Sequence, residues 1–160
     1  MNLNKIPPQI PVIVGIDPDS DKHGVAIYQD GKLIDLRSMR LVDFFSLDCE
    51  FEISEVHIEN VCANNATFSK SFVKNQRAQS TISRSVGMCQ QAQIELERVF
   101  ELLNIKVIKH PISKSWKESK SGNKRLKQLG WDGKSNEDTR SAAYFGHLGV
   151  RSWHTTKTKS

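Results

Sequence analysis

Three carboxylates stand where predicted secondary-structure elements begin or end. Asp17 directly follows a short apolar run rich in β-branched residues, Val12–Ile16, and Glu59 closes a second run, Val56–Glu59. Such runs are too short for a helix and are typical of buried strands. Asp138 opens the last predicted helix, on the stripe expected to pack inward. Carboxylates from three elements, gathered at one sheet edge, favour hard divalent cations such as Mg²⁺, and two such ions can drive phosphodiester hydrolysis by an activated water.

Each acid also has a purely structural interpretation. Asp17 can cap a turn, and Glu59 taken alone fits an ordinary strand end. Ser135 and Asp138 fit a helix capping box, which would make Asp138 structural. Adjacent helical residues point about 100° apart, so only one of Glu137 and Asp138 can face the sheet. These alternatives stay open at the level of sequence.

The remaining pattern predicts an α/β domain. Five strands are expected, and they cover Val12–Ile16, Val25–Tyr28, Lys32–Leu36, Val56–Glu59 and Ile105–Ile108. Helices are expected at Leu41–Phe45, from Gln76 to about Leu103, and from Asn136 to about Gly149. The first three strands form an antiparallel meander, and the long helix joins two parallel strands by a right-handed crossover. The fold class is a mixed five-stranded sheet flanked by helices.

The segments between these elements look less regular. The acidic stretch Ser46–Ser54 is expected to be irregular, and Asn60–Lys74 to be a long loop. Ser113–Leu129 is basic and partly helical, with a break expected at Gly122.

Length and composition bound the class of protein. The 160 residues suit one domain at residues 12–150, with a loose arm at 1–11 and a basic, mobile tail at 151–160. No apolar run could span a bilayer. The three cysteines make neither a zinc spacing nor a disulfide framework, and no signal peptide is evident, which indicates a reducing cytoplasm. A net charge of +5 favours a polyanionic partner.

Basic residues flank the proposed acids. One group surrounds the start of the long helix and another precedes the last helix; they comprise Lys70, Lys74, Arg77, Arg84, Lys114, Lys117, Lys120, Lys124, Arg125 and Lys127. Such runs can neutralise phosphates, although a solvated helix face is the ordinary interpretation of a charge run. Trp116 and Trp131 could stack on bases or pack in the core.

Four motifs in order resemble those of RuvC-type Holliday junction resolvases. They are GIDPDSDKHGVAI from Gly15, IEN at Ile58–Asn60, PISKSWK at Pro111–Lys117 and NEDTRSAAYFG from Asn136. The resemblance implies a ribonuclease H-like fold and a homodimer that binds four-way DNA junctions during DNA recombination and repair. It also implies paired nicking with two Mg²⁺ ions per active site, for which Mn²⁺ can substitute.

The same resemblance assigns roles to individual residues. Asp17 and Glu59 match the first two catalytic acids, and Asp138 matches the first acid of the last helix. Lys114 and Lys117 fall in the segment that supplies a basic residue near the scissile phosphate.

The chain departs from the family at the acids. Asp19 stands where the family has glycine, which adds a carboxylate close to the metals or pointing away. Ser141 matches the last acid of the helix, and a neutral hydroxyl is a weaker ligand. The site therefore works with three acids, or Asp19 or Glu137 supplies a fourth ligand.

A second departure concerns the aromatic residue that stacks on the junction. Its position falls at Cys62, so either Phe68 or Phe72 replaces it or the junction is opened differently. We predict a structure-selective, Mg²⁺-dependent endodeoxyribonuclease of a divergent or phage-type kind. The alternatives are a non-catalytic junction-binding protein, favoured by Ser141, and a ribonuclease H-like nuclease acting on RNA or replication forks.

Overall fold

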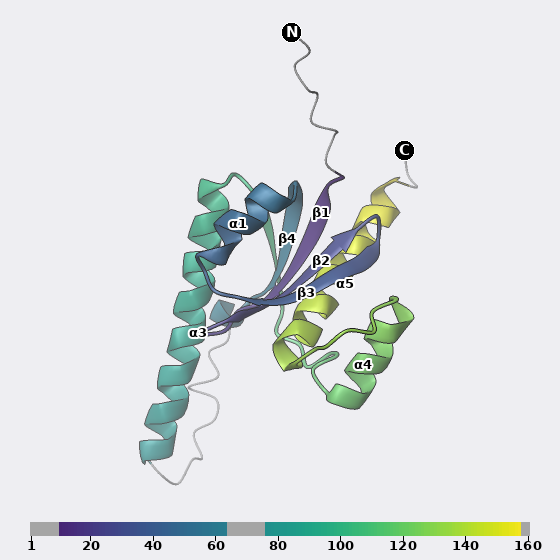
Figure 1. Ribbon diagram of the computed structural model, residues 1–160. Coiled ribbons are helices and arrows are strands. Elements are labelled where there is room, and N and C mark those ends of the chain that lie inside the picture. The colour runs from purple at the N-terminus through teal and green to yellow at the C-terminus, as the bar shows by residue number, and fades with distance from the viewer. Residues whose placement is uncertain (1–9, 64–75, 158–160) are drawn as a thin grey trace.

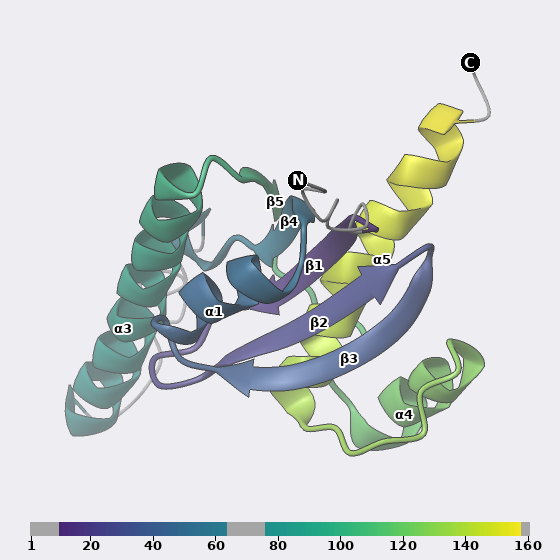
Figure 2. The same ribbon diagram turned by 45° about the horizontal axis from the view of Figure 1, so that its top comes forward.

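The computed structural model describes residues 10–63 and 76–157, and its centre is one mixed sheet between two layers of helices (Figures 1 and 2). Lys70, Phe72 and Lys74, predicted to contact DNA, lie outside the described residues, as does Phe68. The fold of the described part determines where the three candidate acids lie.

The sheet has five strands in the order β3-β2-β1-β4-β5. They are β1 (Val12–Asp17), β2 (His23–Gln29), β3 (Lys32–Met39), β4 (Ile53–Glu59) and β5 (Lys106–His110). The first three form an antiparallel meander, whereas β4 runs parallel to β1, and β5 parallel to β4. This arrangement confirms the predicted fold class, and it places the strand that leads into Asp17 at the centre of the sheet.

Helices cover both faces of the sheet. On one face lie α1 (Asp43–Glu50) and α3 (Gln76–Leu102), and on the other lie α4 (Ser119–Gln128) and α5 (Glu137–Lys157), as Figures 1 and 2 show. Side chains alternate along β1, so Val14 packs toward α1 and α3, whereas Ile13 packs toward α4 and α5. A single 3₁₀ turn, Val61–Ala63, follows β4.

Two expectations for irregular backbone are wrong. The stretch Ser46–Ser54 contains the end of α1 and the start of β4, because Phe44 and Leu47 lie one helical turn apart and both are buried. Gly122 does not break the basic segment; it lies inside α4 and is buried. In both places packing outweighs the local composition.

The last helix is longer than expected. It continues past Gly149 to Lys157, into the segment predicted to be a mobile tail. A side chain at Gly149 would lie 2.4 Å from the His57 ring, so this glycine permits close packing and does not end the helix. Val150 and Trp153 extend the packed face beyond it. No helix in the described part of the chain has the length and apolar character needed to cross a membrane.

The long helix α3 extends beyond the sheet (Figure 1). Its 27 residues span about 40 Å, whereas the six residues of β1 span about 20 Å. Leu96 and Phe100 in its second half are buried, but Ile82 and Met88 in its first half are exposed. The apolar side chains of α3 therefore form a core face only toward its C-terminal end.

Candidate active site

Two of the three predicted acids meet at the carboxyl ends of adjacent parallel strands. Asp17 ends β1 and Glu59 ends β4, and both side chains are buried. The Lys117 ammonium lies between them, with Nζ 3.3 Å from Asp17 Oδ2 and 3.3 Å from Glu59 Oε2. Lys117 comes from the segment between β5 and α4, so three elements build this centre.

The electrostatics of the centre follow from burial and from the second carboxylate. Burial, and then repulsion from Glu59, raise the pKa of Asp17 to about 7, while Lys117 and Ser141 act to lower it. Burial acts to lower the pKa of Lys117, but the two carboxylates outweigh it and the pKa is raised. Once Asp17 has lost its proton, one ammonium faces two carboxylates, and the net negative charge attracts a further cation.

Glu59 is held at both oxygens. Its Oε1 accepts a hydrogen bond from the Ser113 backbone N–H at 3.0 Å, while Oε2 faces Lys117. The residues that directly follow β4 are held by Gln93, a buried residue of α3. Its side-chain amide donates to Asn60 Oδ1 and accepts from the Cys62 N–H. These contacts fix the end of β4, and they suit a carboxylate whose position matters.

The start of α5 is capped by residues other than Asp138. Thr139 N donates to Asn136 Oδ1 at 2.8 Å, and Asn136 N donates to Thr139 Oγ1 at 2.9 Å. This reciprocal pair is the capping box, so the structural role considered for Ser135 and Asp138 is wrong. Asp138 is half-buried and is not used as a cap.

Missing side chains let α5 approach the meander closely. A Cβ on Gly24 would lie 2.2 Å from the Asp138 carbonyl oxygen, and a Cβ on Gly15 would lie 2.1 Å from that of Ala142. Both glycines therefore permit a contact that other residues would prevent. This close approach brings the first turns of α5 to the strand ends.

The remaining acids form an outer group. Burial, and then repulsion from Asp19 and Glu137, raise the pKa of Asp138. Asp19 Oδ1 also accepts from the Asp21 backbone N–H, as in a side-chain-capped turn, and Glu137 is exposed. Within the described residues, no three carboxylate, imidazole or thiol side chains lie close enough together to hold a metal ion. The structure thus joins Asp17 and Glu59 and leaves Asp138 outside that pair.

Ser141, which matches an acid in the resemblance, lies beside Asp17. Its hydroxyl oxygen is buried, and no hydrogen-bond partner of normal geometry is found for it among the described residues. A buried hydroxyl beside Asp17 adds an oxygen that can bind a metal ion together with the carboxylates. An all-oxygen donor set of this kind fits a hard divalent cation.

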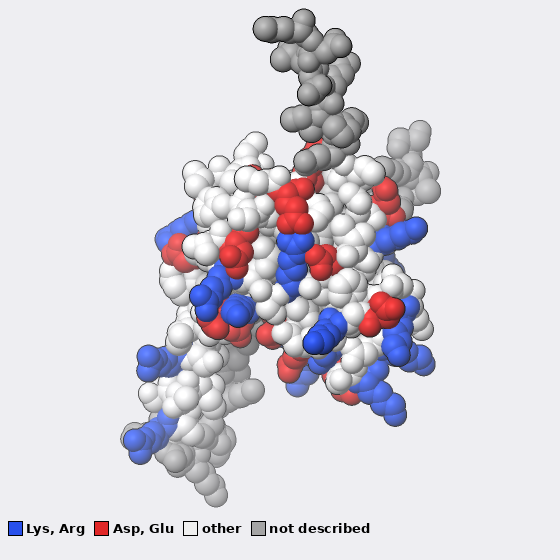
Figure 3. All heavy atoms as spheres, in the orientation of Figure 1, with Lys and Arg blue, Asp and Glu red and all other residues white. Residues whose placement is uncertain are grey.

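The two lysines of the predicted basic segment have different places. Lys117 reaches the acids, whereas Lys114 is exposed and contributes its backbone oxygen to a turn, accepting from Lys117 N. The other basic candidates in the described ranges are exposed on α3 and α4, and they are Arg77, Arg84, Lys120, Lys124, Arg125 and Lys127. Figure 3 shows Lys and Arg side chains gathered over α4 and spaced along α3.

The two tryptophans considered for base stacking both pack against the hydrophobic core. Trp116 packs against Tyr144 and His147, and Trp131 packs on the same cluster, with its indole N–H bonded to the Lys134 carbonyl. Both residues are half-buried and pack against the core, as one of the two interpretations predicts.

Sequence reasoning missed Arg140 and Gln93. Arg140 is buried on α5, and its guanidinium contacts the backbone of Lys117. The available signal was a charged residue among the small residues of the motif NEDTRSAAYFG. Gln93 offered no such signal, because a glutamine is ordinary in a helix and its buried position depends on β4.

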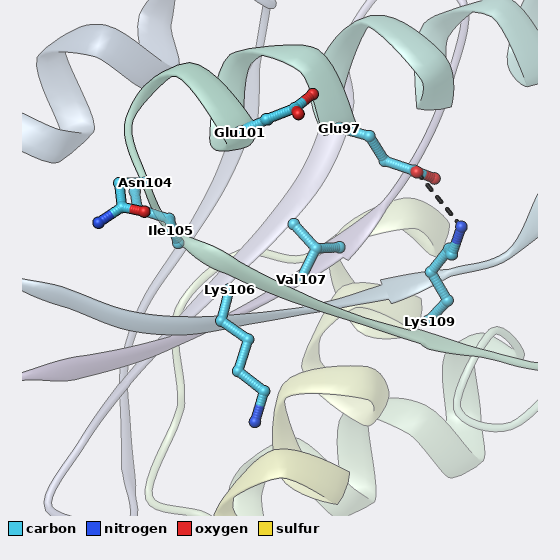
Figure 4. Close-up of a pocket in the computed structure, with 7 residues that line it drawn as sticks. All are labelled: Glu97, Glu101, Asn104, Ile105, Lys106, Val107 and Lys109. Atoms are coloured by element: carbon cyan, nitrogen blue, oxygen red, sulfur yellow. Dashed lines mark hydrogen bonds and ion pairs between the residues drawn. The ribbon is translucent and has the colours of Figure 1, made fainter.

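A separate depression lies at the corner between α3 and β5 (Figure 4). It has a volume of about 520 Å³, and its lining includes the ion pair of Glu97 and Lys109 at 3.3 Å. Lys106, at the start of β5, also lines it, whereas the acids lie at the carboxyl ends of β1 and β4. This depression is therefore distinct from the acidic centre.

Comparisons of the sequence with protein-family models and with curated proteins find no match. Among solved structures, the chain is similar to Thermus thermophilus RuvC in complex with a Holliday junction substrate, with a TM-score of 0.57 and 12% identity over 89% of this chain and 96% of that one. A second Thermus thermophilus RuvC structure matches with a TM-score of 0.57 and 12% identity, over 91% and 97% of the two chains. The chain has the ribonuclease H-like fold of RuvC. Fowlpox virus resolvase, in complex with Holliday junction DNA, matches with a TM-score of 0.48 and 14% identity over 88% and 99%.

Proposed function

We propose that this chain is a metal-dependent endonuclease that resolves four-way DNA junctions by paired nicks. The observation that supports this most is the buried pair of Asp17 and Glu59, on adjacent parallel strands of a RuvC fold, with Lys117 between them. The similar Thermus thermophilus protein is in complex with a Holliday junction substrate, which favours branched DNA as the substrate class.

In this proposal Asp17, Glu59 and the Ser141 hydroxyl are oxygen ligands, and Asp138 joins them at the mouth of the site. Two Mg²⁺ ions, or Mn²⁺ in their place, supply an activated water and stabilise the leaving oxygen. Lys117 stabilises negative charge that develops on the phosphate. The Ser113 N–H keeps the Glu59 carboxylate in a fixed orientation.

The basic residues over α4 bind the phosphate backbone in this proposal. Lys120, Lys124 and Lys127 are exposed and close in sequence to Lys117, so DNA held there can reach the acids. Phosphate contacts position the substrate and carry no sequence information.

A homodimer completes the proposed enzyme, because a four-way junction has two equivalent strands to cut. The exposed apolar side chains of α3 offer a dimer face; they include Ile82, Met88 and Ile94. Two sites related by a two-fold axis would place one nick on each strand. The three cysteines are free, which suits action in a reducing cytoplasm.

A second candidate function is junction binding without cleavage. It is favoured by Ser141 in place of an acid and by an ammonium group between the two buried carboxylates. Magnesium-dependent nicking separates the two functions.

The test compares a labelled four-way junction with linear duplex of the same sequence, in Mg²⁺ and in Mn²⁺. Wild type and Asp17→Asn are assayed for cleavage and for binding. We expect symmetric nicks in the junction alone, lost in Asp17→Asn while binding persists. Tight junction binding with no nicks in either metal would leave a binding protein. Equal cutting of junction and duplex, or cutting of RNA or fork substrates instead, would keep the nuclease and reject the substrate.

A further inference from the structure

The Arg140 guanidinium holds the backbone of Lys117. Arg140 is 7% exposed, and its Nη2 and Nε donate to the Lys117 carbonyl oxygen at 2.7 and 3.2 Å. Its Nη1 donates to Ser135 Oγ at 3.3 Å. Arg140 thus connects α5 to the residue whose ammonium group lies between Asp17 and Glu59.

This contact places a buried charge on neutral acceptors. None of the ion pairs among the described residues involves Arg140, although Glu118 and Asp138 lie near enough to feel its charge. A buried charge without a paired carboxylate costs free energy, and an apolar side chain would serve plain packing better. The value of Arg140 therefore lies in what its three hydrogen bonds position, two of which are made to the Lys117 carbonyl.

The neighbouring backbone shows that the position of Lys117 is specified. Trp116 has a left-handed backbone, with φ of 64°, which is unfavourable for a residue with a side chain. A Cβ on Gly122 would lie 2.1 Å from the Trp116 carbonyl oxygen and 2.7 Å from Arg140 Cδ. The turn at residues 115–117 therefore lies against the backbone of Gly122, where a side chain would not fit, and beside Arg140. The Trp116 ring packs toward Tyr144, and the next residue faces the acids.

We propose that Arg140 is a positioning residue for cleavage: it fixes the Lys117 backbone so that Nζ lies between Asp17 and Glu59. This inference rests on the proposed nuclease function. Arg140 contacts neither acid within the described hydrogen bonds, so it acts through Lys117. Its removal is expected to slow the chemical step without weakening the binding of the junction.

The first test is a double-mutant cycle on single-turnover cleavage of the four-way junction. Arg140→Met keeps an apolar stem and removes the donors; we expect about a tenfold slower cleavage rate and an unchanged junction Kd. In a Lys117→Met background the same change should cost less than about twofold, because the group that it positions is gone. Losses that multiply fully would overturn the proposal. Arg140→Lys, which keeps one donor, should give an intermediate rate; should Arg140→Met fail to fold, Arg140→Lys takes its place in the cycle.

A second readout does not depend on activity. The acetylation rate of Lys117 by an amine-reactive ester, measured by mass spectrometry of the folded protein, should rise several-fold in Arg140→Met, while that of the exposed Lys32 stays constant. Arg98→Ala, at an exposed position on α3, is the matched control and should change neither rate. An unchanged Lys117 rate in folded Arg140→Met would overturn the proposal. Absence of cleavage by wild type together with a raised Lys117 rate would instead reject only the proposed function.

Discussion

Two lysine–carboxylate contacts of equal length lie in different surroundings. At the α3–β5 corner, Lys109 Nζ lies 3.3 Å from Glu97, and the two side chains are 49% and 32% exposed (Figure 4). At the strand ends, Lys117 Nζ lies 3.3 Å from Glu59, and here the side chains are 24% and 2% exposed. Distance alone does not distinguish these pairs.

Burial and the number of carboxylates do distinguish them. Both partners of the corner pair are partly exposed to water, which screens their attraction, so the contact contributes little stability. At the strand ends, desolvation and a second acid raise the pKa of Asp17 to about 7, and the ammonium compensates in part. A site for chemistry on phosphate needs charges that water does not screen, and of these two pairs the one at the strand ends meets that requirement.

The strongest test of the difference between the two pairs is to neutralise one carboxylate in each. Glu59→Gln should reduce junction cleavage at least about 10³-fold, because it removes a proposed metal ligand held at both oxygens. Glu97→Gln should leave the rate within about twofold of wild type, since Glu97 contacts Gln93 and Lys109 and neither proposed metal ligand. Single-turnover rates on the four-way junction measure both. Equal losses in the two variants would contradict the assignment.

Removing the lysines gives the next largest effect. Lys117→Met should slow cleavage about 10- to 100-fold and destabilise the fold by about 1–3 kcal/mol at pH 8, because two buried carboxylates lose their partner. Lys109→Met should cost less than about 1 kcal/mol. Urea unfolding without divalent ions measures the stability difference. A Lys117→Met variant as stable as Lys109→Met would show that burial does not separate the pairs.

The pH dependence of stability sharpens the comparison further. Folded Asp17 keeps its proton up to about pH 7, whereas the unfolded chain loses it near the ordinary value of 3.8. The folded state binds more protons in this window, so the Asp17 contribution is favourable at low pH and is lost as pH rises from about 4 to 7.

Asp17→Asn should therefore lose less stability than wild type over that range, with a difference of up to about 3 kcal/mol. Thermal unfolding from pH 4 to 8 in a chelator measures it. Asp132→Asn, at an exposed loop position, is the control and should keep the wild-type slope. A wild-type slope in Asp17→Asn would contradict the raised pKa.

The smallest effect concerns binding. Alanine at Lys120, Lys124 and Lys127 should reduce the salt dependence of junction binding by about one unit of log Kd per log salt for each phosphate that is no longer neutralised. Alanine at Lys106 and Lys109, beside the corner depression, should leave the slope unchanged. Fluorescence anisotropy from 50 to 200 mM salt, about the range where phosphate contacts dominate, measures both sets. Equal salt dependence in the two sets of variants would show that the DNA does not bind over α4.

Local sequence determined which residues end the strands. The β-branched run before Asp17 and the run closed by Glu59 form buried strands because short apolar segments with such residues pack well in a sheet. The meander and the crossover through α3 followed from turn residues and helical period. The resemblance of the motifs to those of RuvC-type resolvases indicated the same two acids, Asp17 and Glu59.

Tertiary structure alone decided which of the candidates meet. Lys117 and Lys114 are equivalent in the sequence, yet the left-handed turn at Trp116 and the Arg140 contact bring only Lys117 to the acids. Asn136, and not Ser135, caps α5, so the Asp138 carboxylate is not needed for capping. The placement of Lys117 depends on its contact with Arg140, 23 residues further along the chain, and local composition carries no information about such a contact. The Asn136–Thr139 cap, in contrast, joins residues only three apart.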